Sequence, residues 1–169
     1  VFFLDEEMLD LMRGSKCQYL SMAIESGSPR VLKEIVHKPV KLDHARKMAD
    51  YARKLGIDTT ALFVIGFPGE KWCEIRETIK FAEDIGTDYV KFNVMCPYPG
   101  TKIYDQITKE GKWGKLIDGY DSDQLTNHEV VFIPHGYKNA EEILEMRKYA
   151  FRKYYFRPQY IASRIFKIR

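Results

Sequence analysis

The sequence has few cysteines and no long apolar run, and both absences narrow the class of protein. Its 169 residues include three cysteines, Cys17, Cys73 and Cys96, spaced too far apart for a disulfide framework or a close-spaced zinc or iron–sulfur motif. No apolar stretch approaches the roughly 18 residues that a membrane span needs, and no signal peptide is recognisable. We therefore expect a cytoplasmic globular protein in which Cys17 and Cys73 are packing residues.

Acidic residues are absent from the C-terminal segment 147–169, although the whole chain is nearly balanced in charge. The chain has 27 Lys and Arg against 24 Asp and Glu, whereas this segment has 8 Lys and Arg, no acid and many Tyr and Phe. Cations interleaved with aromatic residues are typical of nucleic-acid or membrane-surface binding. They are equally typical of a docking helix whose aromatic side chains pack on the body of the protein, and composition leaves both interpretations open.

Hydrophobic periodicity predicts an alternation of strands and helices. Short runs rich in β-branched and aromatic residues predict buried strands at residues 18–24, 59–65 and 89–95. Amphipathic stretches predict helices at residues 5–12, 28–36, 43–55, 72–85, 139–156 and 159–166. Strands that alternate with helices imply right-handed crossovers, so the fold class is α/β with a parallel sheet.

The chemistry of a parallel α/β protein sits beyond the carboxyl ends of its strands. The first predicted strand runs directly into Glu25 and Ser26, so a carboxylate and a hydroxyl reach the rim of the sheet, where they can grip a vicinal diol or an amine. A second interpretation is that Ser26 or Ser28 caps the following helix. The two interpretations are compatible, and both stay open here.

The other two strand ends are rich in glycine and proline. Gly66 and Gly69 flank Phe67-Pro68, and backbone without a Cβ lets a flat ring approach the strand end. Glu70 follows at the start of a helix, where a carboxylate favours the helix dipole whatever its function. The third end, residues 96–101, has two prolines that restrict the backbone before a turn. Motifs of other catalytic classes, such as G-x-S-x-G, H-E-x-x-H and the phosphate-binding loop, are absent.

These strand ends together resemble the second half of the radical S-adenosylmethionine (SAM) core, in the branch that often carries a cobalamin-binding domain. The phrases that carry the resemblance are MAIESGSPRVL at 22–32, LFVIGFPGE at 62–70, PYPGT at 97–101 and YYFRPQYI at 154–161. The resemblance implies a partial (βα) barrel with parallel strands and crossover helices. It divides the chain into residues 1–111, the second half of the barrel, and a mostly helical extension at 112–169. It also favours the docking-helix interpretation of the basic segment.

The resemblance implies a set of SAM contacts. Glu25 and Ser26 match the position that contacts the ribose or amino-acid part of SAM, and His37 and Lys38 match a region that offers a cation to the SAM carboxylate in some relatives. Residues 64–67 match the motif that lies along the adenine, and residues 95–97 match the backbone that completes the adenine pocket. Asn93 is a candidate polar group inside the barrel, with a satisfied core amide as its alternative. The candidate cofactor-binding residues are Glu25, Ser26, His37, Lys38, Val64, Gly66, Phe67, Asn93, Met95 and Pro97.

The family also holds a [4Fe–4S] cluster on a C-x3-C-x2-C loop, and this chain has no such loop. We therefore expect a fragment of a radical SAM enzyme that begins near the third barrel strand, with Val1-Phe2-Phe3 as a remnant of that strand. The cluster would belong to the missing N-terminal half, cobalamin would be a further cofactor of the parent, and the isolated chain would be inactive. No metal ligands are expected here.

Three functions from different classes remain open. The first is part of a radical SAM oxidoreductase or methyltransferase that cleaves SAM to a 5′-deoxyadenosyl radical and acts on a lipid, a tetrapyrrole or another small molecule. The second is a non-catalytic interaction module. The third is an RNA- or membrane-binding domain led by the basic segment, which the resemblance disfavours. An open sheet edge, where the missing half-barrel would pair, also invites a homodimer.

Overall fold

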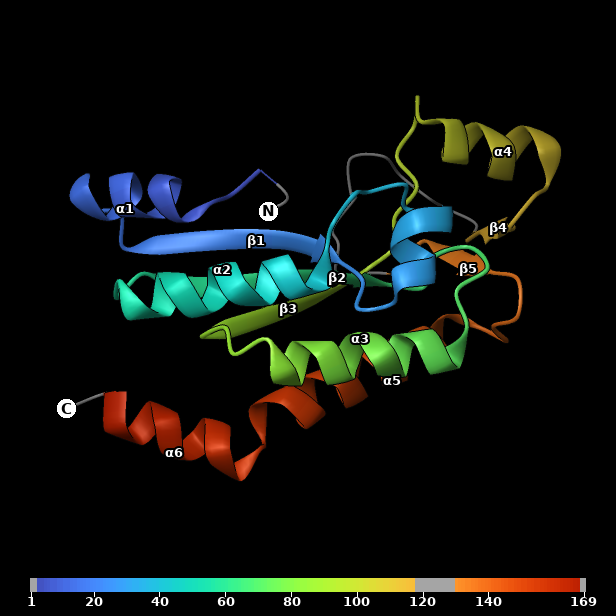
Figure 1. The fold of residues 1–169 in the computed structure, drawn as a ribbon. Helices are drawn as coiled ribbons and strands as arrows, with labels where there is room; N and C mark the ends of the chain where they lie inside the picture. Colours follow the sequence, from blue (N-terminus) through green and yellow to red (C-terminus); the bar gives the residue numbers. More distant parts are fainter. Residues whose placement is uncertain (1–2, 118–129, 168–169) are drawn as a thin grey trace.

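The computed structural model describes residues 3–117 and 130–167 and has a three-stranded parallel sheet at its centre (Figure 1). The strands are β1 (Tyr19–Glu25), β2 (Asp58–Ile65) and β3 (Tyr89–Val94), in the spatial order β1-β2-β3. They confirm the three predicted strands within one residue at either end, and the α/β fold class with them. The strand remnant expected at residues 1–3 lies partly outside the described residues, and Phe3 is in a turn.

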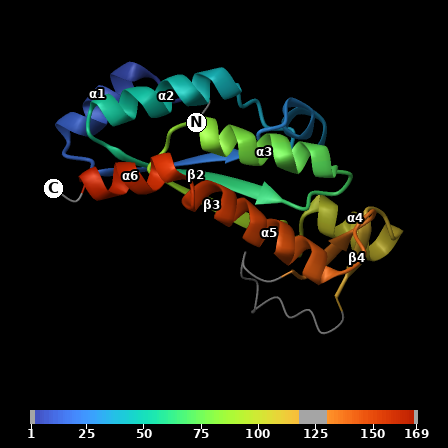
Figure 2. The same cartoon turned by 90° about the horizontal axis from the view of Figure 1, so that it is seen from below.

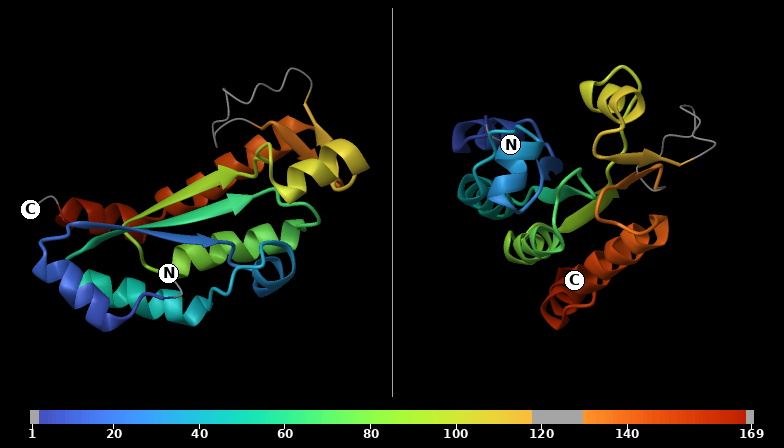
Figure 3. Two further views of the ribbon diagram at one scale, coloured as in Figure 1. Left: turned by 90° about the horizontal axis from the view of Figure 1, so that it is seen from above. Right: turned by 90° about the vertical axis from the view of Figure 1, so that its right-hand side faces the viewer.

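One face of the sheet carries the core, and helices cover that face (Figures 2 and 3). The covering helices are α2 (Leu42–Lys54), α3 (Trp72–Asp84) and α5 (Ala140–Tyr155), and α1 (Glu6–Gly14) packs beside α2. Alternate residues of each strand point to this face, as the two-residue period requires. Three aromatic rings meet at its centre, where Phe92 stacks on Phe63 at 5.6 Å and meets Phe151 of α5 edge-on at 5.5 Å.

Two predicted helices differ in detail from the structure. The helix expected to start at Asp43 starts at Leu42, with Lys41 as its N-cap, so the Asp43 carboxylate lies in the first turn instead of capping. The short helix expected at residues 28–36 contains a π-helical turn, η1 (Val31–Ile35), whose extra residue per turn no sequence pattern announced. Both differences are local, and the order of elements is unchanged.

The region after β3 adds a second small layer near the C-terminal ends of the strands (Figure 1). It consists of α4 (Lys102–Glu110) and an antiparallel pair, β4 (Gly114–Leu116) with β5 (Phe132–Pro134). Thr101 caps α4, since its hydroxyl accepts from the Tyr104 backbone N–H. The sequence had shown only a loose pattern here, because each of these strands has just three residues.

The basic C-terminal segment forms most of α5 and all of the described part of α6 (Pro158–Lys167). Three of its tyrosines pack together: Tyr154 is fully buried, and Tyr155 and Tyr160 contact it at 4.9 and 5.1 Å between ring centroids. Arg164 pairs with buried Asp88 at 2.9 Å. This packing matches the docking-helix interpretation. No helix in the described part of the chain is both long and apolar enough to cross a membrane.

Candidate functional site

The C-terminal ends of the three strands lie side by side at one edge of the sheet, which is where the sequence predicts the site (Figure 3). Two of these ends leave the strand through a left-handed backbone conformation, at Glu25 (φ 74°) and Gly66 (φ 81°). Such a conformation is strained for a residue with a side chain, so its presence at Glu25 needs a compensating interaction. That interaction comes from Lys38.

Lys38 holds the end of β1. Its ammonium group donates to the Glu25 carboxylate at 2.7 Å and to the Ala23 carbonyl at 2.9 Å, on both sides of a register shift in the β1–β2 ladder. Both side chains are about three-quarters buried, with 24% and 22% of their surface exposed. Lys38 therefore fixes the direction in which the carboxylate leaves the sheet. Two residues to which the resemblance assigns contacts with SAM thus lie in direct contact with each other.

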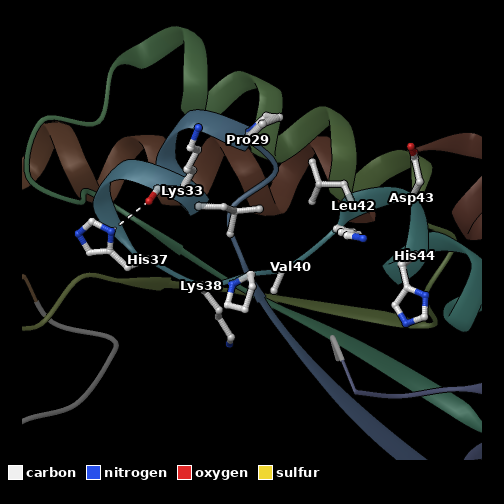
Figure 4. Close-up of a pocket in the computed structure, with 11 residues that line it drawn as sticks. Pro29, Lys33, His37, Lys38, Val40, Leu42, Asp43 and His44 are labelled. Atoms are coloured by element: carbon white, nitrogen blue, oxygen red, sulfur yellow. Dashed lines mark hydrogen bonds between the residues drawn. The ribbon is translucent and has the colours of Figure 1, made fainter.

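The side chains of His37 and Lys38 point in different directions although the two residues are adjacent in sequence. His37 has a left-handed backbone (φ 54°), is exposed, and bonds the Lys33 carbonyl through Nδ1 at 3.0 Å. Figure 4 shows the His37 ring and the Lys38 side chain pointing in different directions beside an open cavity of about 1000 Å³. The cavity is lined by Pro29, Leu32, Lys33, His37, Lys38, Pro39, Val40, Lys41, Leu42, Asp43 and His44. A cation role for His37 stays a prediction.

Ser26 is fully buried and engaged in structure. Its hydroxyl is 3.0 Å from the Thr78 hydroxyl of α3 and accepts from the Ser28 N–H at 3.1 Å. Gly27 completes the contact, because a Cβ there would lie 2.7 Å from the Thr78 Cα. Neither Ser26 nor Ser28 caps the following helix with its side chain, since η1 has Arg30 as its N-cap and no side-chain cap bond. The Ser26 hydroxyl instead joins the β1 end to α3. Its contact with SAM stays a prediction.

Glu70 organises the turn after β2 in a way that the helix dipole does not explain. Its Oε2 accepts from the backbone N–H groups of Gly66 at 2.8 Å and Phe67 at 3.1 Å. Only 5% of the residue is exposed, and burial raises the pKa of the Glu70 carboxyl to about 7. Within the described residues Oε1 is buried without a hydrogen-bond partner, as is the Tyr137 hydroxyl. Glu70 serves the local structure, as expected, but as a bridge across the turn.

Arg30 ties the same turn to the end of β1. Its guanidinium donates to the Gly69 carbonyl at 2.9 Å and forms a bidentate pair with Glu74 of α3. This pair holds the pKa of the Glu74 carboxyl below its ordinary value. Sequence reasoning assigned no role to Arg30. Two features of the sequence could have indicated this role: Arg30 lies five residues after Glu25, and Glu74 is an acid in the first turn of α3, the helix that follows β2.

Three of the residues that are predicted to contact the adenine of SAM belong to one apolar cluster. Met95 is buried with Ile107 and Phe132, and Val64 and Phe67 pack against this group. The cluster joins the ends of β2 and β3 to α4 and β5, so the small second layer covers the rim at this point. It presents an apolar wall beside the open backbone of Gly66, where a Cβ would have only the Ile143 side chain within 4 Å, at 3.7 Å.

Asn93 and Pro97 flank this cluster on β3 and beyond it. Asn93 stands opposite Val64 in the ladder, on the face of the sheet that lies away from the covering helices, and it is partly exposed. Pro97 is buried. The turn that follows ends at Gly100 (φ 84°) and is closed by the Thr101 hydroxyl, which donates to the Tyr98 carbonyl at 2.7 Å. The place of Asn93 inside a barrel stays a prediction.

The three cysteines are reduced and far apart, and they do not fit an iron–sulfur cluster. Cys17 precedes β1, Cys96 follows β3 at the opposite end of the sheet, and Cys73 lies on α3. Cys73 is exposed, so its assignment as a packing residue was wrong; it occupies the solvent side of the first helical turn. Among the described residues no three His, Cys, Asp or Glu side chains gather as a metal site.

Comparison with known proteins gives a consistent family. Residues 1–82 match the radical SAM superfamily. The chain is 32% identical over 150 residues to cytidylyl-2-hydroxyethylphosphonate methyltransferase of Streptomyces wedmorensis, covering 85% of this chain and 27% of that protein. It is 29% identical over 168 residues to an uncharacterised methyltransferase of Pyrococcus horikoshii, covering 96% of this chain and 34% of that protein. The chain thus spans about a third or less of these relatives.

A solved structure has a similar fold. The radical SAM methyltransferase TsrM of Kitasatospora setae, whose structure holds cobalamin and a [4Fe–4S] cluster, aligns with a TM-score of 0.58 and 19% identity. The alignment covers 63% of this chain and 20% of that chain. At this identity the likeness concerns the fold, and it supports the expected partial barrel.

Proposed function

The chain belongs to the radical SAM superfamily, and we propose that its three strand ends bind SAM within a radical SAM enzyme. One observation carries the proposal: Glu25, the Gly66–Phe67 turn and Met95 lie at one edge of a parallel sheet, and two of these strand ends break into left-handed backbone. Ligands of parallel sheets bind at this edge, and open backbone admits a flat ring.

The apolar wall suits the adenine. Val64, Phe67 and Met95 present side chains of one cluster, Gly66 leaves backbone uncovered beside them, and Pro97 restricts the chain that closes the pocket. Glu70 and Arg30 keep the turn in place from behind through bonds to Gly66, Phe67 and Gly69. A ring placed here would be held mainly by apolar contact and backbone groups.

The polar end of the site suits the ribose and methionine parts. Within the described residues, the Oε2 atom of Glu25 has no bonded partner, while Oε1 bonds Lys38. Glu25 can therefore accept from a ribose hydroxyl or an amine without losing Lys38, and Lys38 retains a second bond at Ala23. Ser26, His37 and Asn93 complete the proposed polar set, with Ser26 acting through the loop that it anchors.

The radical chemistry needs a cofactor that these residues do not hold. SAM, when cleaved reductively at a [4Fe–4S] cluster, supplies a 5′-deoxyadenosyl radical that abstracts hydrogen from an unreactive carbon. The cysteines of this chain do not fit the cluster, so no step of that reaction is assigned to them. The part proposed for this chain is to bind and orient the adenosyl group and to exclude water from it.

The proposal extends to the whole enzyme. We propose that the enzyme acts on a small-molecule substrate, that the missing half of the barrel pairs with β1, and that cobalamin serves the enzyme as it is present in TsrM. We also propose the division into barrel residues 1–111 and an extension at 112–169. A homodimer through the β1 edge is the remaining association that this architecture allows.

The test is a titration of the 169-residue chain with SAM and with 5′-deoxyadenosine, followed by the backbone amide signals in NMR spectra. We expect both ligands to shift the amides of Glu25, Gly66, Phe67 and Met95. Gly66→Ala should weaken this binding at least about tenfold, because a methyl group there occupies the open backbone. Gly56→Ala is the matched control, since Gly56 also has a left-handed backbone (φ 72°) with nothing within 4 Å but lies at the far end of the sheet. Equal losses in both variants, or shifts away from the strand ends, would contradict the proposal.

A further inference from the structure

The sheet has a second face, which the described chain covers only at the rim, where α4 and β5 pack on Val64. The side chains on it come from alternate strand positions, and the ladder aligns Ser21, Thr60 and Tyr89 in one row and Ala23, Leu62 and Lys91 in the next. In a closed barrel this face is the interior. Interior positions of a barrel are normally filled by apolar or small residues, so charged residues on this face mark a site or a partner.

Lys91 is the cation on this face, in the middle of β3. It is exposed, and no carboxylate in the described part of the chain pairs with it. The acids nearest along this face are Asp58 and Glu25. Asp58 lies four residues before Leu62, the ladder partner of Lys91, which is about 13 Å along the strand. Glu25 is two strands away and already bonds Lys38.

A cavity of about 350 Å³ opens beside Lys91. The residues that line it combine two cations, one amide and several aromatic side chains, and among the described residues no acid: Tyr19, Thr60, Tyr89, Val90, Lys91, Asn93, Arg147, Phe151 and Tyr155. Arg147 reaches it from α5, where its Nε donates to the Phe92 carbonyl at 2.8 Å. Burial lowers the pKa of the Arg147 guanidinium, as expected for a cation in a partly desolvated place.

Lys91, with which no described carboxylate pairs, and the side-chain amide of Asn93 favour an oxyanion as the occupant. Carboxylate and phosphoryl oxygens accept charge-assisted hydrogen bonds from Lys and Arg, which are stronger than neutral ones, and an amide N–H₂ adds a further donor. The cavity thus differs from the rim, where Glu25 brings a negative charge.

We propose that this cavity binds an oxyanion group, a carboxylate or a phosphoryl group, of the substrate, with Lys91 as its principal ligand and Asn93 and Arg147 beside it. The inference rests on the proposed function, because it takes this second face of the sheet as the interior of a barrel. Lys91 precedes Met95 at the rim by four residues, about 13 Å along the strand. The substrate class is therefore an elongated anion: its charged end lies in the cavity and its reacting carbon lies near the rim.

The test uses the 169-residue chain and two probes, inorganic phosphate and acetate, titrated at constant ionic strength with chloride as the reference anion. Backbone and side-chain NMR signals of Lys91 and Asn93 report the binding. We expect phosphate or acetate, or both, to shift these signals saturably, whereas chloride does not; the probe that binds more tightly identifies the phosphoryl or the carboxylate class. Lys91→Met should weaken binding at least about fivefold.

Two control variants make the result decisive. Lys54→Met removes the same charge from an exposed position at the end of α2 and should change the affinity less than twofold. Lys91→Arg keeps a cation and should retain binding, which separates lost charge from lost folding. Saturable shifts that are absent, that occur elsewhere, or that Lys91→Met and Lys54→Met weaken equally would overturn the inference. Adenosyl binding is read at Gly66 and Phe67, so failure of the SAM proposal would be seen separately.

Discussion

The two outer edges of the sheet, along β3 and along β1, differ in how their outward backbone groups are hydrogen-bonded. Along β3 the outward backbone groups are bonded by side chains of α5: the Tyr155 hydroxyl accepts from the Val90 N–H at 3.1 Å and donates to the Val90 carbonyl at 2.8 Å. The Arg147 guanidinium donates to the Phe92 carbonyl. Just before the strand, the Tyr154 hydroxyl donates to the Thr87 carbonyl at 2.6 Å. A strand arriving at this edge would have to displace α5.

Among the described residues, no helix covers the β1 edge in this way. The Gln18 carbonyl accepts from the Asp58 N–H, so the even-numbered residues of β1 turn their backbone groups to β2, and the odd-numbered residues turn theirs outward. The Ala23 carbonyl, bonded by Lys38, is one of these outward groups. Ser21 lies exposed at the middle of this edge, and among the described residues no strand pairs with it.

Because of this difference, a further strand can pair with the sheet at β1 but not at β3. Unpaired edges recruit strands, whereas an edge whose N–H and C=O groups are already satisfied does not. Any further strand therefore joins at β1, which is where a barrel would continue. The difference also accounts for the unusual composition of the C-terminal segment, because tyrosine and arginine combine an apolar body with the donors that a sheet edge requires.

The largest effect is expected from removing the anchor of α5 at the covered edge. Tyr154 is fully buried, and its hydroxyl bonds the Thr87 carbonyl. Tyr154→Ala should lower the free energy of unfolding by about 3–5 kcal/mol, because it leaves a cavity and an unpaired carbonyl. Urea denaturation measures it. Phe156→Ala, at a residue that is 75% exposed, is the control and should cost less than about 0.5 kcal/mol. Similar costs for both would mean that α5 does not seal this edge.

A pair of proline substitutions probes the open edge. Leu20→Pro removes an N–H that faces β2 and should cost about 3 kcal/mol or more, whereas Ser21→Pro removes an outward N–H and should cost about 1 kcal/mol or less. Thermal and urea unfolding of the two variants give the difference. If Ser21→Pro is as harmful as Leu20→Pro, the outer edge of β1 is paired in solution, and size measurements would then show whether a second copy pairs with it.

A third prediction concerns the turn between the two edges, at the end of β2. Burial raises the pKa of the Glu70 carboxyl to about 7 from its ordinary value of 4.5. The folded state then binds a proton that the unfolded state has lost, so the free energy of unfolding should fall as the pH rises from 4.5 through 7. The fall is at most about 3 kcal/mol. Urea denaturation between pH 5 and pH 8 measures it.

Glu70→Gln should abolish this fall, because glutamine keeps an acceptor for Gly66 and Phe67 but does not titrate. Glu77→Gln makes the same charge change on the exposed side of α3 and should leave the fall in place. A wild-type protein that becomes more stable between pH 5 and pH 8, with Glu70→Gln equally pH-dependent, would show that Glu70 is charged throughout.

The sequence predicts the strands and long helices well because their signals are local. The period of two in Tyr89–Val94 and the helical stripe in Trp72–Asp84 each identify an element without reference to its neighbours. It also places Glu25 and Gly66 at strand ends, since these residues follow directly after apolar runs. The rim of the sheet could therefore be predicted, together with its candidate residues.

What the sequence does not predict depends on contacts between distant segments. The bridge from Glu70 to the backbone of its own turn and the Arg30–Glu74 pair require the crossover geometry, and the bonds from Tyr155 to Val90 join residues 65 apart. The three-residue strand Gly114–Leu116 pairs with Phe132–Pro134 and has too short a pattern to stand out. In each case the structure depends on which polar groups form hydrogen bonds, and hydrophobic periodicity does not indicate these partners.

The smallest effect is expected from removing the Tyr155 hydroxyl, which makes two hydrogen bonds to Val90 at the covered edge. Tyr155→Phe keeps the ring against Phe151 but leaves the Val90 N–H and carbonyl without their partner, which should cost about 1–2 kcal/mol. Hydrogen exchange of the Val90 amide should accelerate by more than the global loss of stability implies, since the opening is local. Tyr149→Phe, on the same helix and 44% exposed, should leave that amide unchanged. If Val90 exchanges at the wild-type rate in Tyr155→Phe, a neighbour other than α5 protects the edge, and the contrast between the two edges would then rest on packing rather than on these hydrogen bonds.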